Sequence, residues 1–201
     1  MSWRDRIIDA GDSRESWLRA RYDIVGASDA KALARESSVE SVLKSKLADR
    51  AWLGNAYTAS GQRWEPMLLA WAGIPGNTAL IHSEREPGHA CTPDGILELP
   101  NGRVGLAEVK AKHGIIVTGP TLAEWRQVAF QLYCFPEADW VEWVWGEILR
   151  NGELRQGNPK SIRIERDHPK IVQIQLKLIP LADDLLFALR AARAFERELS
   201  A

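Results

Sequence analysis

The chain has 201 residues, a net charge of −1 and only two cysteines. This length suits one domain with its own core, and the two distant cysteines exclude a disulfide framework or a zinc or iron–sulfur set. No run of about 18 apolar residues occurs and the N-terminus lacks an apolar signal core, so we expect a cytoplasmic protein without a membrane span. The near-neutral charge argues against non-specific coating of DNA, which requires a basic excess.

Helical patterns dominate the N-terminal part of the chain. A short helix is predicted over residues 13–20. Ser28 is the expected N-cap of a second helix over residues 29–36, since a serine hydroxyl can accept a bond from the first turn. Apolar residues at helical spacing predict two more helices, over residues 39–52 and 60–71.

The middle of the chain changes to the two-residue period of strands. Residues 79–84, 95–99 and 104–111 are predicted strands, and the turn at residues 100–102 makes a hairpin of the last two. Pro120 suits the first turn of a helix, which is predicted to extend to about residue 135.

The C-terminal part is predicted to contain two strands and a long helical segment. The strands cover residues 140–149 and 161–166. The helical segment follows Pro169, with Pro180 expected to interrupt it before residues 182–199. The order of elements predicts an α/β fold with a mixed central β-sheet flanked by helices.

Two carboxylates and a lysine form the candidate chemical site. Asp94 lies in a tight turn, and fourteen positions later Glu108 and Lys110 occupy one face of a predicted strand. Carboxylate oxygens are the ligands that Mg²⁺ prefers, and the carbonyl of Val109 offers one more oxygen. Lys110 can then orient or deprotonate the attacking water, or neutralise the transition state. Glu65 is a candidate outer ligand; charges alternating on a solvated strand remain the alternative for Glu108 and Lys110.

These residues also carry a resemblance to a known family. Pro93-Asp94 followed by Glu108-Val109-Lys110 is similar to the motif of the PD-(D/E)XK nuclease superfamily, and the wider pattern resembles lambda-type phage alkaline exonucleases and their YqaJ-like relatives. The resemblance covers roughly residues 14 to 170. It is carried, in chain order, by Trp17 with Arg21, Ile24 to Asp29, Gly61 with Glu65, Thr92 to Gly95, Glu108 to Lys110, Trp125 to Gln131, and Ile164 to Asp167.

The resemblance implies a restriction-endonuclease-like core in a single nuclease domain over residues 1–201. It implies a 5′→3′ exonuclease that degrades one strand of linear double-stranded DNA and leaves a 3′ overhang for phage recombination. The implied cofactor is Mg²⁺, two ions per active site, with Mn²⁺ also able to serve. The implied partners are double-stranded DNA ends, a single-strand annealing protein and two further copies in a homotrimeric ring, all in the cytoplasm of a bacterial host.

The resemblance also implies roles for four more residues. Arg21 and Ser28 would bind the terminal 5′ phosphate of DNA, which suits a guanidinium and a helix N-terminus. The alternative is that Ser28 is only a helix cap and Arg21 only a surface charge. A glutamine of the helix over residues 120–135 would enter the active site; Gln127 is slightly preferred, and Gln131, one turn later on the same face, remains open.

Two other functions remain open from the sequence. The first is a structure-specific endonuclease or a helicase-associated nuclease domain of the same superfamily, although many of these have four cysteines for an iron–sulfur cluster. The second is a DNA-end-binding protein without catalytic activity. The presence of Glu65, Asp94, Glu108 and Lys110 together argues against a decayed catalytic site.

Overall fold

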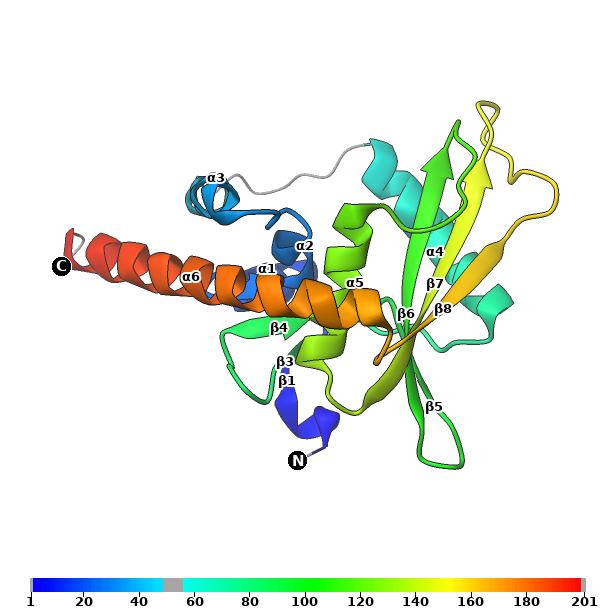
Figure 1. The fold of residues 1–201 in the computed structure, drawn as a ribbon. Coiled ribbons are helices and arrows are strands. Elements are labelled where there is room, and N and C mark those ends of the chain that lie inside the picture. The colour runs from blue at the N-terminus through cyan, green and yellow to red at the C-terminus, as the bar shows by residue number, and fades with distance from the viewer. Residues whose placement is uncertain (1, 49–55, 200–201) are drawn as a thin grey trace.

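The computed structural model describes residues 2–48 and 56–199 (Figure 1). Within these residues, no helix is long and apolar enough to cross a membrane. The elements, in chain order, are η1 (Trp3–Arg6), β1 (Ile7–Asp9), α1 (Arg14–Ala20), β2 (Val25–Gly26), α2 (Ala27–Ala30), α3 (Glu36–Leu47), α4 (Ala56–Ala72), β3 (Leu80–His82), β4 (His89–Cys91), β5 (Gly95–Glu98), β6 (Val104–His113), α5 (Leu122–Cys134), β7 (Ala138–Ile148), β8 (Lys160–Glu165) and α6 (Pro169–Leu199).

The larger sheet has the strand order β5-β6-β7-β8. β6 and β7 are parallel, whereas β5 pairs with β6 and β8 pairs with β7 in antiparallel fashion. A parallel pair needs a crossover between its strands, and α5 provides it. The predicted mixed sheet flanked by helices is therefore confirmed, and Figure 1 shows α4 and α5 beside it.

Helices cover both faces of β6. Ala107 and Val109 pack in one apolar cluster with Leu68 of α4. Leu106 packs in the main core with Val128 of α5. Because alternate residues of a strand point to opposite faces, the even-numbered positions of β6 lie toward α5 and the odd-numbered ones toward α4. This alternation directs Glu108 and Lys110, the predicted site residues of β6, toward α5.

A second sheet, with the strand order β1-β3-β4-β2, was not predicted. The strand predicted over residues 79–84 is present as β3, but β1, β2 and β4 have only two or three residues each and are too short to show a two-residue period. β2 runs parallel to β4, and this pairing brings the residues after β2 close to the turn after β4. The smaller sheet thus brings together two segments that are far apart in the sequence.

The predicted helix over residues 29–36, capped by Ser28, is wrong. α2 ends at Ala30, and its N-cap is Gly26, whose amide donates to Asp29 Oδ2 at 2.8 Å. A new helix, α3, begins at Glu36 after an extended residue at Arg35. The Asp29 carboxylate takes the capping role that the sequence pattern assigned to the hydroxyl of Ser28, which leaves that hydroxyl available for another contact.

Three other helices differ from prediction at their ends or in continuity. α5 begins at Leu122, two residues after Pro120, because Thr121 Oγ1 caps it by accepting from Glu124 N. α4 begins at Ala56, earlier than predicted, and residues 49–52 of the helix predicted over 39–52 lie outside the described residues. The expected interruption at Pro180 is absent: α6 is continuous from Pro169 to Leu199, with Pro180 on its exposed side.

We expect Gly105→Ala to destabilise the larger sheet. A Cβ at Gly105 would lie 2.3 Å from Cζ2 of Trp140, a fully buried side chain on the neighbouring strand β7. Overpacking of this kind costs about 1–3 kcal/mol in free energy of unfolding. Thermal unfolding measures the effect, with Gly119→Ala as control, since its Cβ would meet Ile162 at an ordinary 3.5 Å. An unchanged melting temperature for Gly105→Ala would contradict the packing of Trp140.

Candidate active site

Asp94 and Glu108 lie on adjoining segments at the start of the β5–β6 hairpin. Asp94 N donates to Ala107 O at 3.0 Å, and Asp94 Oδ2 accepts from Val109 N at 2.6 Å. Glu108 lies between these two backbone contacts and is 1% exposed. The hairpin register therefore brings together the two carboxylates that the sequence spacing predicted.

The turn that carries Asp94 is held by a residue that the sequence did not point to. Asn77 Nδ2 donates to Pro93 O at 2.9 Å, and the backbone amide of Asn77 donates to Asp94 O at 2.9 Å. Burial, followed by the charge of Glu108, raises the pKa of Asp94 well above its usual range. A carboxylate held rigidly and at such electrostatic cost is typical of a functional site.

Lys110 lies beside Glu108 and forms an ion pair with Glu108 Oε1. Burial by itself would lower the pKa of Lys110, but the charges of Glu108 and Asp94 and the bond to Glu108 outweigh it, so the net pKa is raised. Lys110 is therefore a protonated ammonium in the protein without metal. In that form it can neutralise charge on a phosphate or hold a water, two of the roles expected from the sequence.

Of the two candidate glutamines, Gln131 is the one that contacts a predicted site residue. Its Nε2 donates to Glu108 Oε2 at 2.5 Å, and its side chain is fully buried. No hydrogen bond connects Gln127 with Glu108 among the described residues, and the buried Gln127 Oε1 has no partner there. The contact favours Gln131 over Gln127, contrary to the preference drawn from the sequence, because the rotation of α5 decides which residue faces β6.

Glu65, on α4, approaches the same group from the other side. Burial, and then the charge of Glu108, raises the pKa of Glu65, whereas Lys110 opposes the shift. Glu65 and Asp94 both line a cavity of about 1020 Å³. This position suits the expected outer role of Glu65.

Arg21 and Ser28 line that same cavity. Arg21 Nη2 donates to Ser28 Oγ at 2.5 Å, and the guanidinium lies 4.4 Å from the ring centre of Trp17. Burial lowers the pKa of Arg21, while the charge of Asp29 opposes the shift. The pair is thus an oriented cation and hydroxyl facing a cavity, rather than a helix cap and a free surface charge.

The rest of the cavity wall includes residues to which the sequence assigned no individual role. Trp17 Nε1 donates to Thr92 Oγ1 at 3.3 Å, which links α1 to the turn that carries Asp94. Lys46 forms an ion pair with Asp29 at 2.9 Å, with both side chains largely buried. These contacts depend on α1, α3 and the β4–β5 turn meeting at one place, which no local pattern reveals.

The donor set fits a magnesium site that is open to substrate. Among residues 2–48 and 56–199, no group of three or more His, Cys, Asp or Glu side chains is arranged to enclose a metal ion. Magnesium, however, is usually held by one or two carboxylates and keeps several waters. Asp94 and Glu108 supply hard oxygens, and the buried Gln131 Oε1 beside them has no hydrogen-bond partner in the described structure. Both observations are consistent with a cation at this place.

Comparison with solved structures shows which proteins share this fold. An alkaline exonuclease from Laribacter hongkongensis matches 92% of this chain and 99% of its own, with a TM-score of 0.64 and 21% identity. The same enzyme in complex with dAMP matches with a TM-score of 0.63. A phage-related exonuclease from Haemophilus somnus 129PT matches 85% of this chain and 96% of its own, with a TM-score of 0.59 and 13% identity.

No protein-family model matches the chain, and neither does any curated protein. The structural matches nevertheless extend over nearly the whole length of the exonucleases and of this chain. The fold expected from the resemblance, with a core like that of the PD-(D/E)XK nucleases, is therefore confirmed. The chain has the fold of an alkaline, phage-type exonuclease.

Proposed function

We propose that this chain is a Mg²⁺-dependent 5′→3′ exonuclease that degrades one strand of linear double-stranded DNA and leaves a 3′ single-stranded overhang. One observation carries the proposal: a single cavity is lined both by the Arg21–Ser28 pair and by the carboxylates Glu65 and Asp94. An anion-binding pair and a hydrolytic centre in one cavity suit a substrate that ends in a phosphate and is cleaved nearby.

The roles of the residues follow from their contacts. Arg21 and Ser28 bind the terminal 5′ phosphate through the guanidinium and the hydroxyl that already face each other at 2.5 Å. Asp94 and Glu108, with the carbonyl of Val109, are the residues that would hold Mg²⁺. Lys110 neutralises developing charge on the scissile phosphate or orients the attacking water.

Mg²⁺ bound at these residues supplies Lewis-acid chemistry and a nucleophile at neutral pH. Gln131 fixes the Glu108 carboxylate through its amide, which keeps one carboxylate oxygen in a defined direction. Glu65 lies farther out and holds a water on the cavity side. We infer two metal ions per site, with Mn²⁺ able to replace Mg²⁺.

The wider setting is part of the same proposal. A homotrimeric ring that encloses DNA would explain how a chain with a net charge of −1 keeps its substrate, since enclosure needs little bulk electrostatic attraction. A single-strand annealing protein would take over the 3′ overhang in phage recombination, in the cytoplasm of a bacterial host. The exonuclease activity named for the proteins of similar fold supports the nuclease part of the proposal.

End-labelled DNA tests the proposed function. A linear duplex labelled at the 5′ end of one strand should release labelled mononucleotide first in the presence of Mg²⁺, and none in EDTA. A duplex labelled at the 3′ end should keep its label on a shortening strand. Early release of the 3′ label would contradict the proposed direction. Binding of DNA ends without any release would favour the non-catalytic end-binding alternative.

We expect Arg21→Ala to remove most of the preference for a 5′-phosphorylated end. A hydrogen bond to a charged group contributes about 1.5–3 kcal/mol, so the ratio of rates on 5′-phosphate and 5′-hydroxyl ends should fall about 10- to 100-fold. Processivity should fall as well. The matched control is Arg19→Ala, an exposed arginine of α1 that pairs only with Glu15 in the described structure. An unchanged rate ratio for Arg21→Ala would contradict the phosphate role.

A further inference from the structure

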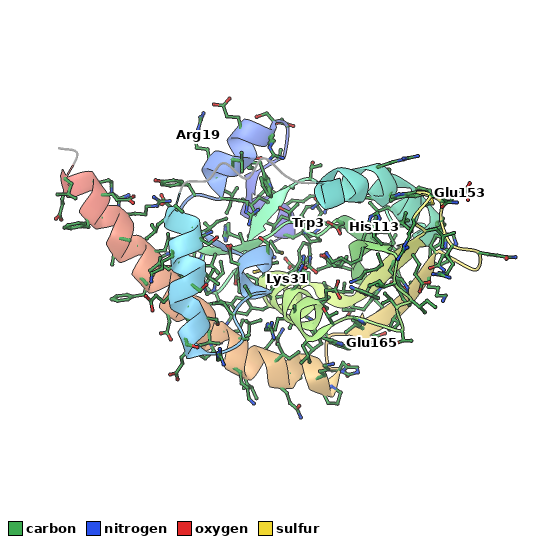
Figure 2. All side chains as sticks on the ribbon, turned by 90° about the horizontal axis from the view of Figure 1, so that it is seen from above. Trp3, Arg19, Lys31, His113, Glu153 and Glu165 are labelled. Carbon is green, nitrogen blue, oxygen red and sulfur yellow. The ribbon has the colours of Figure 1, made fainter. Side chains whose placement is uncertain are left out.

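Lys31 is a half-buried lysine next to the carboxylate and lysine cluster, and no other role in the site accounts for it. It directly follows α2 and keeps helical backbone angles, with φ −50° and ψ −36°. Arg126 Nε of α5 donates to Lys31 O at 2.9 Å, so the backbone of Lys31 is fixed against α5. Figure 2 shows Lys31 in the region where α2 meets α5.

The charges around Lys31 leave its ammonium group without a counterion. Two ion pairs lie next to it: Lys110 with Glu108, and Lys112 with Glu124 at 2.5 Å. Each carboxylate already has its own lysine, and the Lys31 ammonium forms no hydrogen bond or ion pair with any residue that the structure describes. Burial, then the charge of Lys110, lowers the pKa of Lys31, while the charges of Glu124 and Glu108 act in the opposite direction without outweighing them. A half-buried, unpaired cation of this kind is suited to an anion that arrives from outside.

The position of Lys31 next to Ser28 indicates a phosphate of the DNA backbone as the anion. Ser28 and Lys31 are three residues apart on one helical turn and therefore share a face. Ser28 lines the cavity, and Glu108 is among the groups whose charge acts on Lys31. Lys31 thus lies one helical turn from a residue of the proposed pocket for the terminal phosphate, is fixed against α5, and is near enough to the proposed cleavage centre to feel the charge of Glu108. A DNA strand that joins these two places carries backbone phosphates along this path.

We propose that Lys31 binds a non-bridging phosphate oxygen of the cleaved DNA strand, between the Arg21–Ser28 pair and the Asp94–Glu108 carboxylates. The inference rests on the proposed function, because it takes the DNA path from that function. It adds a backbone contact that positions the strand, separate from the end pocket and from the hydrolytic residues. A lysine suits this role because its ammonium binds phosphate as a point charge without selecting a base.

The test is the salt dependence of DNA binding by Lys31→Gln. A 5′-phosphorylated duplex is titrated in EDTA, where no hydrolysis occurs, at several salt concentrations. Loss of one phosphate contact should weaken binding about tenfold and reduce the slope of log Kd against log salt by about 0.9. Lys31→Arg should restore the slope. Lys177→Gln, at an exposed lysine of α6, should leave affinity and slope unchanged.

Thermal unfolding of each variant separates binding from folding. A Lys31→Gln protein with a lower melting temperature but the wild-type salt slope would overturn the proposal, since Lys31 would then act only within the fold. A wild-type slope and affinity would overturn it as well. If the wild-type protein binds duplex ends and only the Lys31 result fails, the proposed function stands. If the wild-type protein binds no duplex end, the proposed function fails together with the inference.

Discussion

Replacing Lys110 by alanine is expected to abolish measurable turnover while DNA binding persists. Lys110 is the only ammonium that pairs with Glu108 in the described structure, and it lies beside Asp94. Removing a group that stabilises charge or transfers a proton in the transition state costs about 10²- to 10⁴-fold in rate. Single-turnover cleavage of a 5′-phosphorylated duplex in Mg²⁺ measures the loss, and a binding titration with the same duplex measures what remains.

The main difficulty with Lys110→Ala is that it leaves Glu108 buried and unpaired, which can destabilise the fold. Lys110→Gln avoids this, because its amide can still donate to Glu108. Both variants should be inactive, and Lys110→Gln should melt close to the wild-type temperature. Lys177→Ala on α6 provides the matched control and should be fully active. A near-normal rate for Lys110→Gln would show that the assigned mechanism is wrong.

Asp94→Asn is expected to inactivate the enzyme while making the metal-free protein more stable. Burial and Glu108 raise the folded-state pKa of Asp94 above its unfolded value, so the folded state binds more protons between these two values. Stability therefore falls as the pH rises through this window, and above it the ionised carboxylate is destabilising. Asparagine removes this cost and can still accept the bond from Val109 N, so the melting temperature in EDTA should rise.

Addition of Mg²⁺ should raise the melting temperature of the wild-type protein more than that of Asp94→Asn. At about 100 times its dissociation constant a ligand stabilises by about 2.7 kcal/mol, which is about 5–10 °C in melting temperature for a chain of this length. We expect the wild-type protein to gain this shift and Asp94→Asn to lose most of it. Asp184→Asn, at an exposed position of α6, should behave like the wild type. An equal Mg²⁺ shift in Asp94→Asn would mean that Asp94 is no metal ligand.

The spacing of the central residues could be predicted because it depends on local rules. A turn followed by a hairpin fixes Asp94 opposite β6, and the two-residue period of a strand puts Glu108 and Lys110 on one face. The mixed sheet was predictable for the same reason, since β5 to β8 are long enough to show their period. In the smaller sheet only β3 was predicted, within residues 79–84, because the other strands are too short to show a period.

The residues that could not be predicted depend on how elements meet. Gln131 rather than Gln127 contacts Glu108 because of the rotation of α5 against the sheet, which its own sequence does not determine. Ser28 looked like a cap, but Asp29 accepts the capping bond and Ser28 faces Arg21. Lys31 has no motif at all; only the two ion pairs beside it show that its charge is unpaired.

The nuclease alternatives share the same hydrolytic residues, so Lys110 and Asp94 variants do not separate them. What separates an exonuclease from an endonuclease is the requirement for an end. The cavity that joins Arg21 and Ser28 to Asp94 predicts such a requirement, because a terminal phosphate has to occupy one part of the cavity for cleavage in the other.

The most direct measurement is therefore a comparison of one plasmid in two forms, covalently closed and linearised with 5′-phosphorylated ends, each incubated with the protein and Mg²⁺. We predict that the linear form is degraded to single-stranded DNA, that the closed circle stays intact, and that Asp94→Asn degrades neither. Cleavage of the closed circle by the wild-type protein, absent in Asp94→Asn, would contradict the end-dependent exonuclease and favour an endonuclease with the same fold.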